Sequence, residues 1–360
     1  MNEAQMQAAR EAMIEWLEHP HELGETPAEI ECAGTFELYD MTYYLFRYRR
    51  KAGDDWLLGV CGGYEGDELE HCGHVYSEME KYEESSAVEK ATAMVEMIRT
   101  YWMEQAKLAE ERKEKAGVFL GFVLLSEDEW DKEQLIRDLK EEWDIDAVED
   151  DGDEIQDDAL AFQVGDMIAV ASVMHAPVPD GEAEVNAENN YMWPEAVDAA
   201  KTHKAQITVA VMGNDAGLKE RGELYVKLAS CCCRQKYATG IYTSGTVFEP
   251  SFYYRFADMM KDGEFPVFNL IWFGLYRRER GVCGYTYGME SFGKDEMEVL
   301  DADAEPSDVQ NFLSSMAAYV IEYDVTLNDG ETIGFSADDK HAITRSEGAA
   351  LPGMTLKIEY

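Results

Sequence analysis

The excess of acidic residues constrains the fold of this chain more than any other feature. The sequence has 74 Asp and Glu against 31 Lys and Arg, which gives a formal net charge of −43 over 360 residues. Self-repulsion of this size opposes compaction, so a folded chain must bury enough apolar surface to overcome it. Hydrophobic residues make up 46% of the sequence and aromatic residues 11%, which is more than a disordered acidic chain carries. We therefore expect a folded body with a negatively charged surface.

The same charge excludes whole classes of partner. A negative field repels phosphate backbones and anionic lipid headgroups, so we expect neither nucleic-acid binding nor membrane binding. The first residues lack the basic and apolar regions of a signal peptide, and apolar runs such as residues 167–174 are too short to span a bilayer. Seven cysteines, three of them consecutive at 231–233, do not suit a disulfide scaffold. We expect a soluble, cytoplasmic protein with reduced thiols.

The first part of the sequence predicts a small α+β domain. Apolar residues at helical spacing predict a helix that Asn2 caps and that ends at His19, and alternating apolar residues between 30 and 60 predict half-buried antiparallel strands. A long helix is expected from Ser86, and its apolar stripe gives way to the charged run 110–115. We place the domain boundary there, with an N-terminal α+β domain over residues 1–113.

The second part, residues 117–360, alternates strand and helix patterns. Asp131 is expected to cap a helix, further helices are expected around 193–200, 218–235, after Pro250 and from Ser307, and Asp329-Gly330 is expected to form a hairpin turn. Strands are predicted at 118–125, 168–174, 205–212, 240–248, 267–276, 285–289, 297–300, 325–335 and 355–360. Several connections are too short for a crossover helix, so the pattern predicts an α+β body of two ferredoxin-like halves.

An ordered series of short motifs in this second part resembles a known family. The motifs are Phe122–Ser126 with Trp143, Met174–Pro179, Trp193, His203–Ala205, Tyr285–Met289, Phe292-Gly293, Glu296–Glu298 and Asp329–Gly334. Over roughly residues 117–360 the series resembles an uncharacterised bacterial family, domain of unknown function 4261. The family has no established activity, so the resemblance implies no catalytic residue.

Two histidines in these motifs lead to a candidate ligand-binding patch. His175 and His203 each lie at a predicted strand end, and two imidazoles in one cleft with a carboxylate would bind a metal or transfer protons. In the alternative interpretation each imidazole hydrogen-bonds a backbone carbonyl and locks a turn. The candidate patch consists of His175, Pro177, Pro179, His203, Glu296 and Glu298.

Other clusters indicate neither a metal nor a cofactor. Cys61, His71, Cys72 and His74 lack the paired spacings of structural zinc ligands. Residues 141–158 contain eleven acids and no base, but their single glycine is misplaced for a calcium loop, so we expect a solvated loop. Cysteines 231–233 on a helix are expected to be buried thiols. We expect no bound metal and no cofactor.

These observations together favour a binding protein over an enzyme. The acidic balance and the lack of a catalytic motif predict a non-enzymatic module that binds a basic protein, for example a toxin or a nuclease. The alternative is a small-molecule binder or an enzyme with a pocket near His175 and His203.

Overall fold

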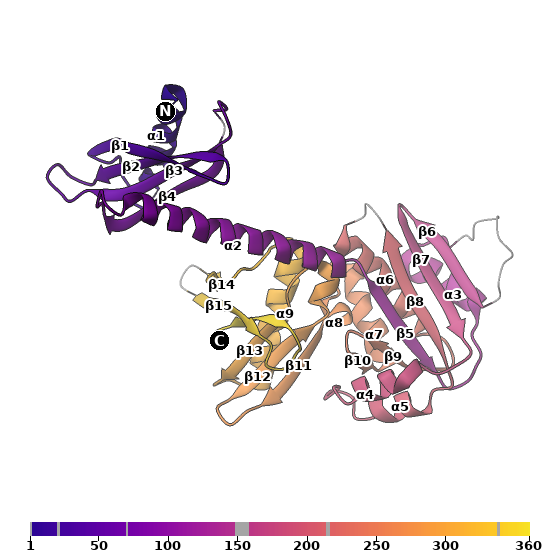
Figure 1. The fold of residues 1–360 in the computed structure, drawn as a ribbon. Coiled ribbons are helices and arrows are strands. Elements are labelled where there is room, and N and C mark those ends of the chain that lie inside the picture. Colours follow the sequence, from indigo (N-terminus) through magenta and orange to yellow (C-terminus); the bar gives the residue numbers. More distant parts are fainter. Residues whose placement is uncertain (1, 20–21, 70, 148–157, 214–216, 337–338) are drawn as a thin grey trace. The chain divides into compact units, whose positions relative to one another are not determined.

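The computed structural model describes residues 2–19, 22–69, 71–147, 158–213, 217–336 and 339–360 (Figure 1). The chain divides into two compact units, Met1–Ala109 and Glu110–Tyr360. Helices and largely antiparallel sheets occur in both units, which confirms the α+β class. The boundary placed at residues 113–117 from the sequence stays a prediction.

The N-terminal unit contains a four-stranded antiparallel sheet. Its strands are β1 (Glu29–Leu38), β2 (Met41–Arg49), β3 (Leu57–Tyr64) and β4 (His71–Lys81), in the order β1-β2-β3-β4. Helix α1 (Glu3–Glu18) precedes the sheet, and helix α2 (Ala87–Lys115) follows it. The side chain of Asn2 accepts hydrogen bonds from the first N–H groups of α1, so the predicted cap is confirmed.

Strand β2 is buried on both of its faces, although the sequence predicted half-buried strands. Tyr44 and Phe46 pack with Met13 of α1 in one apolar cluster, while Tyr43 packs with Val95 of α2 in another. Successive side chains of a strand point to opposite faces, so apolar residues in both phases require cover on both sides. The two helices provide that cover, which makes the unit a sheet between two helices.

The first sheet of the C-terminal unit is six-stranded, and its described pairs are antiparallel. It contains β5 (Phe119–Leu125), β6 (Ala159–Val164), β7 (Met167–Met174), β8 (Ala205–Gly213), β9 (Ala238–Thr243) and β10 (Thr246–Phe248), in the order β10-β9-β5-β8-β7-β6. Helices α3 (Lys132–Trp143) and α6 (Leu218–Cys232) pack in the main core with Val123 of β5. Helices α4 (Glu182–Ala187) and α5 (Ala196–Thr202) pack with Leu124, the next residue, and therefore cover the opposite face.

The second sheet of this unit is mixed. It contains β11 (Trp272–Arg277), β12 (Val282–Tyr287), β13 (Met297–Ala302), β14 (Thr332–Ser336), β15 (Asp339–Glu347) and β16 (Met354–Ile358), in the order β11-β12-β13-β16-β15-β14. Strands β13 and β16 are parallel, which requires a crossover, and helix α9 (Pro306–Glu322) lies in the connection between them. The finer description of the unit as two ferredoxin-like halves stays a prediction.

The predicted strands 267–276 and 325–335 are correct only in their later portions, where β11 and β14 lie. Residues Val267–Leu270 form the short helix α8 directly after Pro266, and strand β11 begins only at Trp272. Asn269 of α8 is buried, and its Nδ2 donates to the backbone carbonyl of Tyr253 in helix α7 (Pro250–Ala257). The turn at Asp329-Gly330 leads into β14, and the described residues 325–328 before it are not a strand. None of the described helices combines the length and apolar character that a membrane crossing requires.

Candidate functional site

His203 holds the backbone of a neighbouring turn. Its side chain is 5% exposed, and the N–H of Val178 donates to Nε2 at 2.8 Å. Because Nε2 accepts, the ring proton lies on Nδ1 and is donated to the carbonyl oxygen of Ala200 at the end of α5. This is the arrangement of the second hypothesis, in which the imidazole locks a turn.

His175 lies between two carboxylates at the surface. Its Nδ1 is 2.6 Å from Oδ1 of Asp128, and its Nε2 is 3.3 Å from Oδ2 of Asp158. Hydrogen bonds to Asp128 and then Asp158 raise the pKa of His175 above its ordinary value, which favours the imidazolium form. Asp128 follows β5, Asp158 precedes β6 and His175 follows β7, so three connections meet at one end of the first sheet.

The predicted patch does not form one site in the described structure. Pro177 and Pro179 are exposed on either side of the buried Val178, and their peptide bonds are trans. His175 and His203 flank this segment but contact different partners, and the contacts of Glu296 and Glu298 are made elsewhere, in the second sheet. The spacing of these residues in the sequence could not show that the histidines and the two glutamates lie at different sheets.

Glu296 is a buried carboxyl group in a cradle of donors. It is 8% exposed and accepts hydrogen bonds from Oγ1 of Thr286 at 2.6 Å and from the N–H groups of Gly288 and Met289 at 2.7 and 2.9 Å. Burial raises the pKa of Glu296 to about 7, although these donors oppose the shift. The cradle depends on Gly288, whose φ of 124° favours glycine and whose Cβ, if added, would lie 2.5 Å from the carbonyl oxygen of Leu270.

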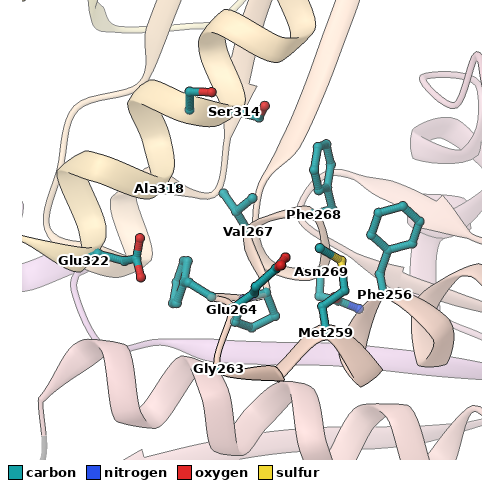
Figure 2. Close-up of a pocket in the computed structure, with 13 residues that line it drawn as sticks. Phe256, Met259, Gly263, Glu264, Val267, Phe268, Asn269, Ser314, Ala318 and Glu322 are labelled. Carbon is teal, nitrogen blue, oxygen red and sulfur yellow. The ribbon is translucent and has the colours of Figure 1, made fainter. Parts of the chain in front are cut away.

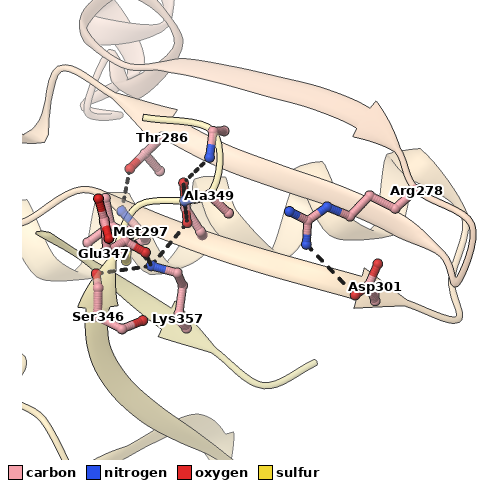
Figure 3. Close-up of polar contacts among 11 residues, drawn as sticks. Arg278, Thr286, Met297, Asp301, Ser346, Glu347, Ala349 and Lys357 are labelled. Carbon is pink, nitrogen blue, oxygen red and sulfur yellow. Dashed lines mark hydrogen bonds and ion pairs between the residues drawn. The ribbon is translucent and has the colours of Figure 1, made fainter. Parts of the chain in front are cut away.

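Glu298 is enclosed and charged. It is 0% exposed and accepts hydrogen bonds from the N–H groups of Ala349 and Ala350 at 2.9 and 2.8 Å. Its carboxylate also forms an ion pair with Nζ of Lys357 at 3.2 Å. Burial alone would raise the pKa of Glu298, but these donors outweigh burial and lower it. Figure 3 shows that Lys357 also reaches the carbonyl oxygens of Ser346 and Glu347. The ion pair therefore connects the end of β15, the 348–350 loop and β16 to β13.

A pocket of about 420 Å³ lies beside this loop and was not predicted. Its lining includes Tyr191, Tyr276, Tyr285, Ala349 and Ala350. Burial raises the pKa of Tyr191 and of Tyr276 to about 12, so both phenols are neutral at physiological pH. The Tyr191 hydroxyl donates to the Phe273 carbonyl at 2.9 Å, which fixes its position in the wall. Tyr285 was singled out in the sequence, but no pattern connected it to residues 191 and 349.

The cysteine and acidic clusters provide no metal site among the residues that the structure describes. Cys61 lies opposite Val75 in the sheet, while His74 lies opposite Gly62. Cysteines 231–233 are buried, as predicted, and burial raises the pKa of Cys231 to about 12, which favours the unreactive thiol. Most of the acidic run 141–158, namely residues 148–157, lies outside the described residues.

Comparison with known proteins gave one match. The model of a family described as Domain of unknown function (DUF4261) matches residues 285–359, which confirms the family resemblance over that segment. The resemblance over residues 117–284 stays a prediction. The matched segment contains Glu296, Glu298 and Lys357. Searches of curated proteins and of solved structures found no match.

Proposed function

We propose that this member of the DUF4261 family is a non-enzymatic binding protein whose partner is a basic protein. The observation that carries the proposal is the location of the carboxylates. Among the described acidic residues, Glu296 and Glu298 are the two that are buried. The sequence has 74 Asp and Glu but only 31 Lys and Arg, so the surface carries a large excess of carboxylates over the cations that could neutralise them.

One end of the first sheet concentrates such carboxylates in a described region. Glu127, Asp128 and Glu129 follow β5, Asp158 precedes β6, and all four are exposed; we call them the acidic edge. The described cations there include His175, discussed above, and Lys204, whose Nζ lies 2.8 Å from both carboxylate oxygens of Glu127. Lys236 also interacts with the charge of Glu129.

The pairs at the acidic edge are suited to exchange with a partner. Exposed ion pairs contribute little to stability because water and salt screen both charges. Lys and Arg side chains of a basic protein can therefore replace His175 or Lys204 without a large loss of stability. Complementary charge of this kind accelerates association and selects basic partners over polyanions.

The ionisable groups that the sequence offered for catalysis support a binding role. The imidazole of His203 is hydrogen-bonded to the backbone of Val178 and Ala200. The carboxylate of Glu298 is bound by Ala349, Ala350 and Lys357. A general base needs a lone pair that can reach a substrate. Groups enclosed in this way stabilise loops instead.

Affinity capture with the full chain tests the proposal. Proteins retained from a cell extract at low salt are identified, purified and measured again by calorimetry. We expect a basic protein whose affinity falls about tenfold when the acidic edge is neutralised by Glu127→Gln, Asp128→Asn and Glu129→Gln. The matched control neutralises three exposed acids of the N-terminal unit, Glu11→Gln, Glu15→Gln and Glu25→Gln. Equal affinities for the two triple variants would contradict the assignment to the acidic edge, and retention of nucleic acid would contradict the proposal itself.

A further inference from the structure

A second pocket of about 420 Å³ opens between helix α9 and the segment that leads from α7 to α8 (Figure 2). Its wall combines the rings of Phe256, Phe265 and Phe268 with the polar side chains of Glu264, Asn269 and Glu322. We propose that this pocket binds a small organic cation, namely a primary ammonium group attached to an apolar or aromatic body.

The aromatic wall favours a cation with an apolar body. Phe256 and Phe268 meet edge to face with their ring centroids 5.4 Å apart, and Phe265 is 8% exposed. Ring faces attract an ammonium group through their quadrupole, and they bury the apolar part of the same ligand. An inorganic ion would use only the first of these contributions.

Asn269 supplies an acceptor that the protein itself leaves unused. The residue is 0% exposed, and its Nδ2 donates to the carbonyl oxygen of Tyr253 at 2.7 Å. Its Oδ1 is buried and has no hydrogen-bond partner within the described structure. A buried acceptor without a donor is unfavourable, and because this oxygen lies within the pocket wall, a ligand N–H group relieves the deficit once the Asn269 side chain turns toward the pocket. An ammonium group provides such donors, whereas an anion or a hydrocarbon does not.

The carboxylates of the pocket carry the complementary charge. Figure 2 shows Glu322 on helix α9 and Glu264 on the facing segment. Lys219 of the chain already makes ammonium contacts at this rim, because its Nζ lies 3.9 Å from Glu322 and 5.9 Å from the centroid of the Phe265 ring. Glu264 makes no ion pair in the described part of the chain. The wall thus has one carboxylate that a lysine partly neutralises and one that is available to a ligand.

Calorimetric titration of the full chain with 2-phenylethylammonium tests the proposal, and 2-phenylethanol serves as the neutral ligand of the same shape. We expect the ammonium compound to bind at least about tenfold more tightly than the alcohol. Equal binding of the two ligands would show an unspecific apolar pocket and overturn the proposal. No binding of the ammonium compound at millimolar concentration would overturn it as well.

Single substitutions then locate the site. Glu264→Gln is expected to weaken binding of 2-phenylethylammonium about fivefold, and Lys219→Gln is expected to strengthen it because Glu322 loses its competing cation. Glu279→Gln removes an equally exposed acid from the β11–β12 hairpin and is expected to leave the affinity unchanged. If Glu264→Gln and Glu279→Gln have the same affinity as the unmodified chain, the ligand binds elsewhere and the assignment fails.

Discussion

Carboxylates in the interior of the C-terminal unit and carboxylates at its acidic edge have opposite surroundings. Glu296 and Glu298 are each enclosed by three described donors, whereas Asp128 and Glu127 at the edge meet single exposed cations. An enclosed carboxylate has fixed partners whose loss is costly. An exposed one keeps the capacity to exchange its partner, which is the property that the proposed binding role requires.

The two interior carboxylates also differ from each other, although they are two residues apart. The N–H groups of Ala349 and Ala350, and then Lys357, lower the pKa of Glu298 despite burial. Glu296 accepts hydrogen bonds from a hydroxyl and from backbone N–H groups but has no cation partner among the described residues, and burial raises its pKa. The donors around Glu298 together outweigh its burial, whereas the donors around Glu296 do not outweigh its burial.

Removal of Lys357 is expected to have the largest effect. Lys357→Met leaves the buried Glu298 without its cation, which we expect to lower the free energy of unfolding by about 3–5 kcal/mol. Urea unfolding of the full chain measures this change. The double variant Glu298→Gln with Lys357→Met removes the unpaired charge and should recover part of the loss. A loss below about 1 kcal/mol in the single variant would contradict a structural role of the pair.

Glu296 is expected to make stability depend on pH. Burial raises its folded-state pKa from 4.5 to about 7, so its contribution to stability is complete below pH 4.5 and is lost as the pH rises through 7. Within that window we expect the unfolding free energy to fall by roughly 1.4 kcal/mol per pH unit relative to Glu296→Gln, or about 3 kcal/mol in total. Glutamine has the shape of the protonated acid and makes the comparison specific. Parallel stability curves for the two proteins from pH 4 to pH 8 would disprove the shift.

Substitution of the two histidines compares the stability contribution of a buried side chain with that of an exposed one. His203→Ala leaves the N–H of Val178 and the carbonyl of Ala200 without their described partner, so we expect a loss of about 1–3 kcal/mol. His175→Ala removes an exposed side chain and should leave the unfolding free energy almost unchanged. Thermal unfolding of both variants is the measurement. A larger loss for His175→Ala would reverse the assignment of structural and surface roles.

Short sequence patterns predicted which helices and strands exist better than the residues at which these elements begin and end. Asp131 caps α3 as expected, because an N-cap is a contact over three residues. Helix α9 begins at Pro306 rather than at Ser307, since proline suits the first position of a helix and Glu305 precedes it. The cover of β2 on both faces was missed because it depends on two helices that are distant in sequence.

The site was predictable only as single residues. Glu296 and Glu298 were named from the sequence, but the groups that set the charge of Glu298 are residues 349–350 and Lys357, more than fifty positions away. The sequence did not identify Asn269 either. Whether its Oδ1 has a hydrogen-bond donor depends on the tertiary structure around it. Long-range partners therefore determine the charge of Glu298, whereas the donors to Glu296 are close to it in sequence.

The salt dependence of association with a basic partner tests the central claim most directly. Stopped-flow or surface measurements with the captured protein give the association and dissociation rates between about 50 and 500 mM salt, where screening becomes strong. The acidic surface predicts an association rate that falls about tenfold or more over this range, with a much smaller change in dissociation, and no binding of duplex DNA at physiological salt. An association rate that does not change with salt, or measurable binding of DNA, would contradict it.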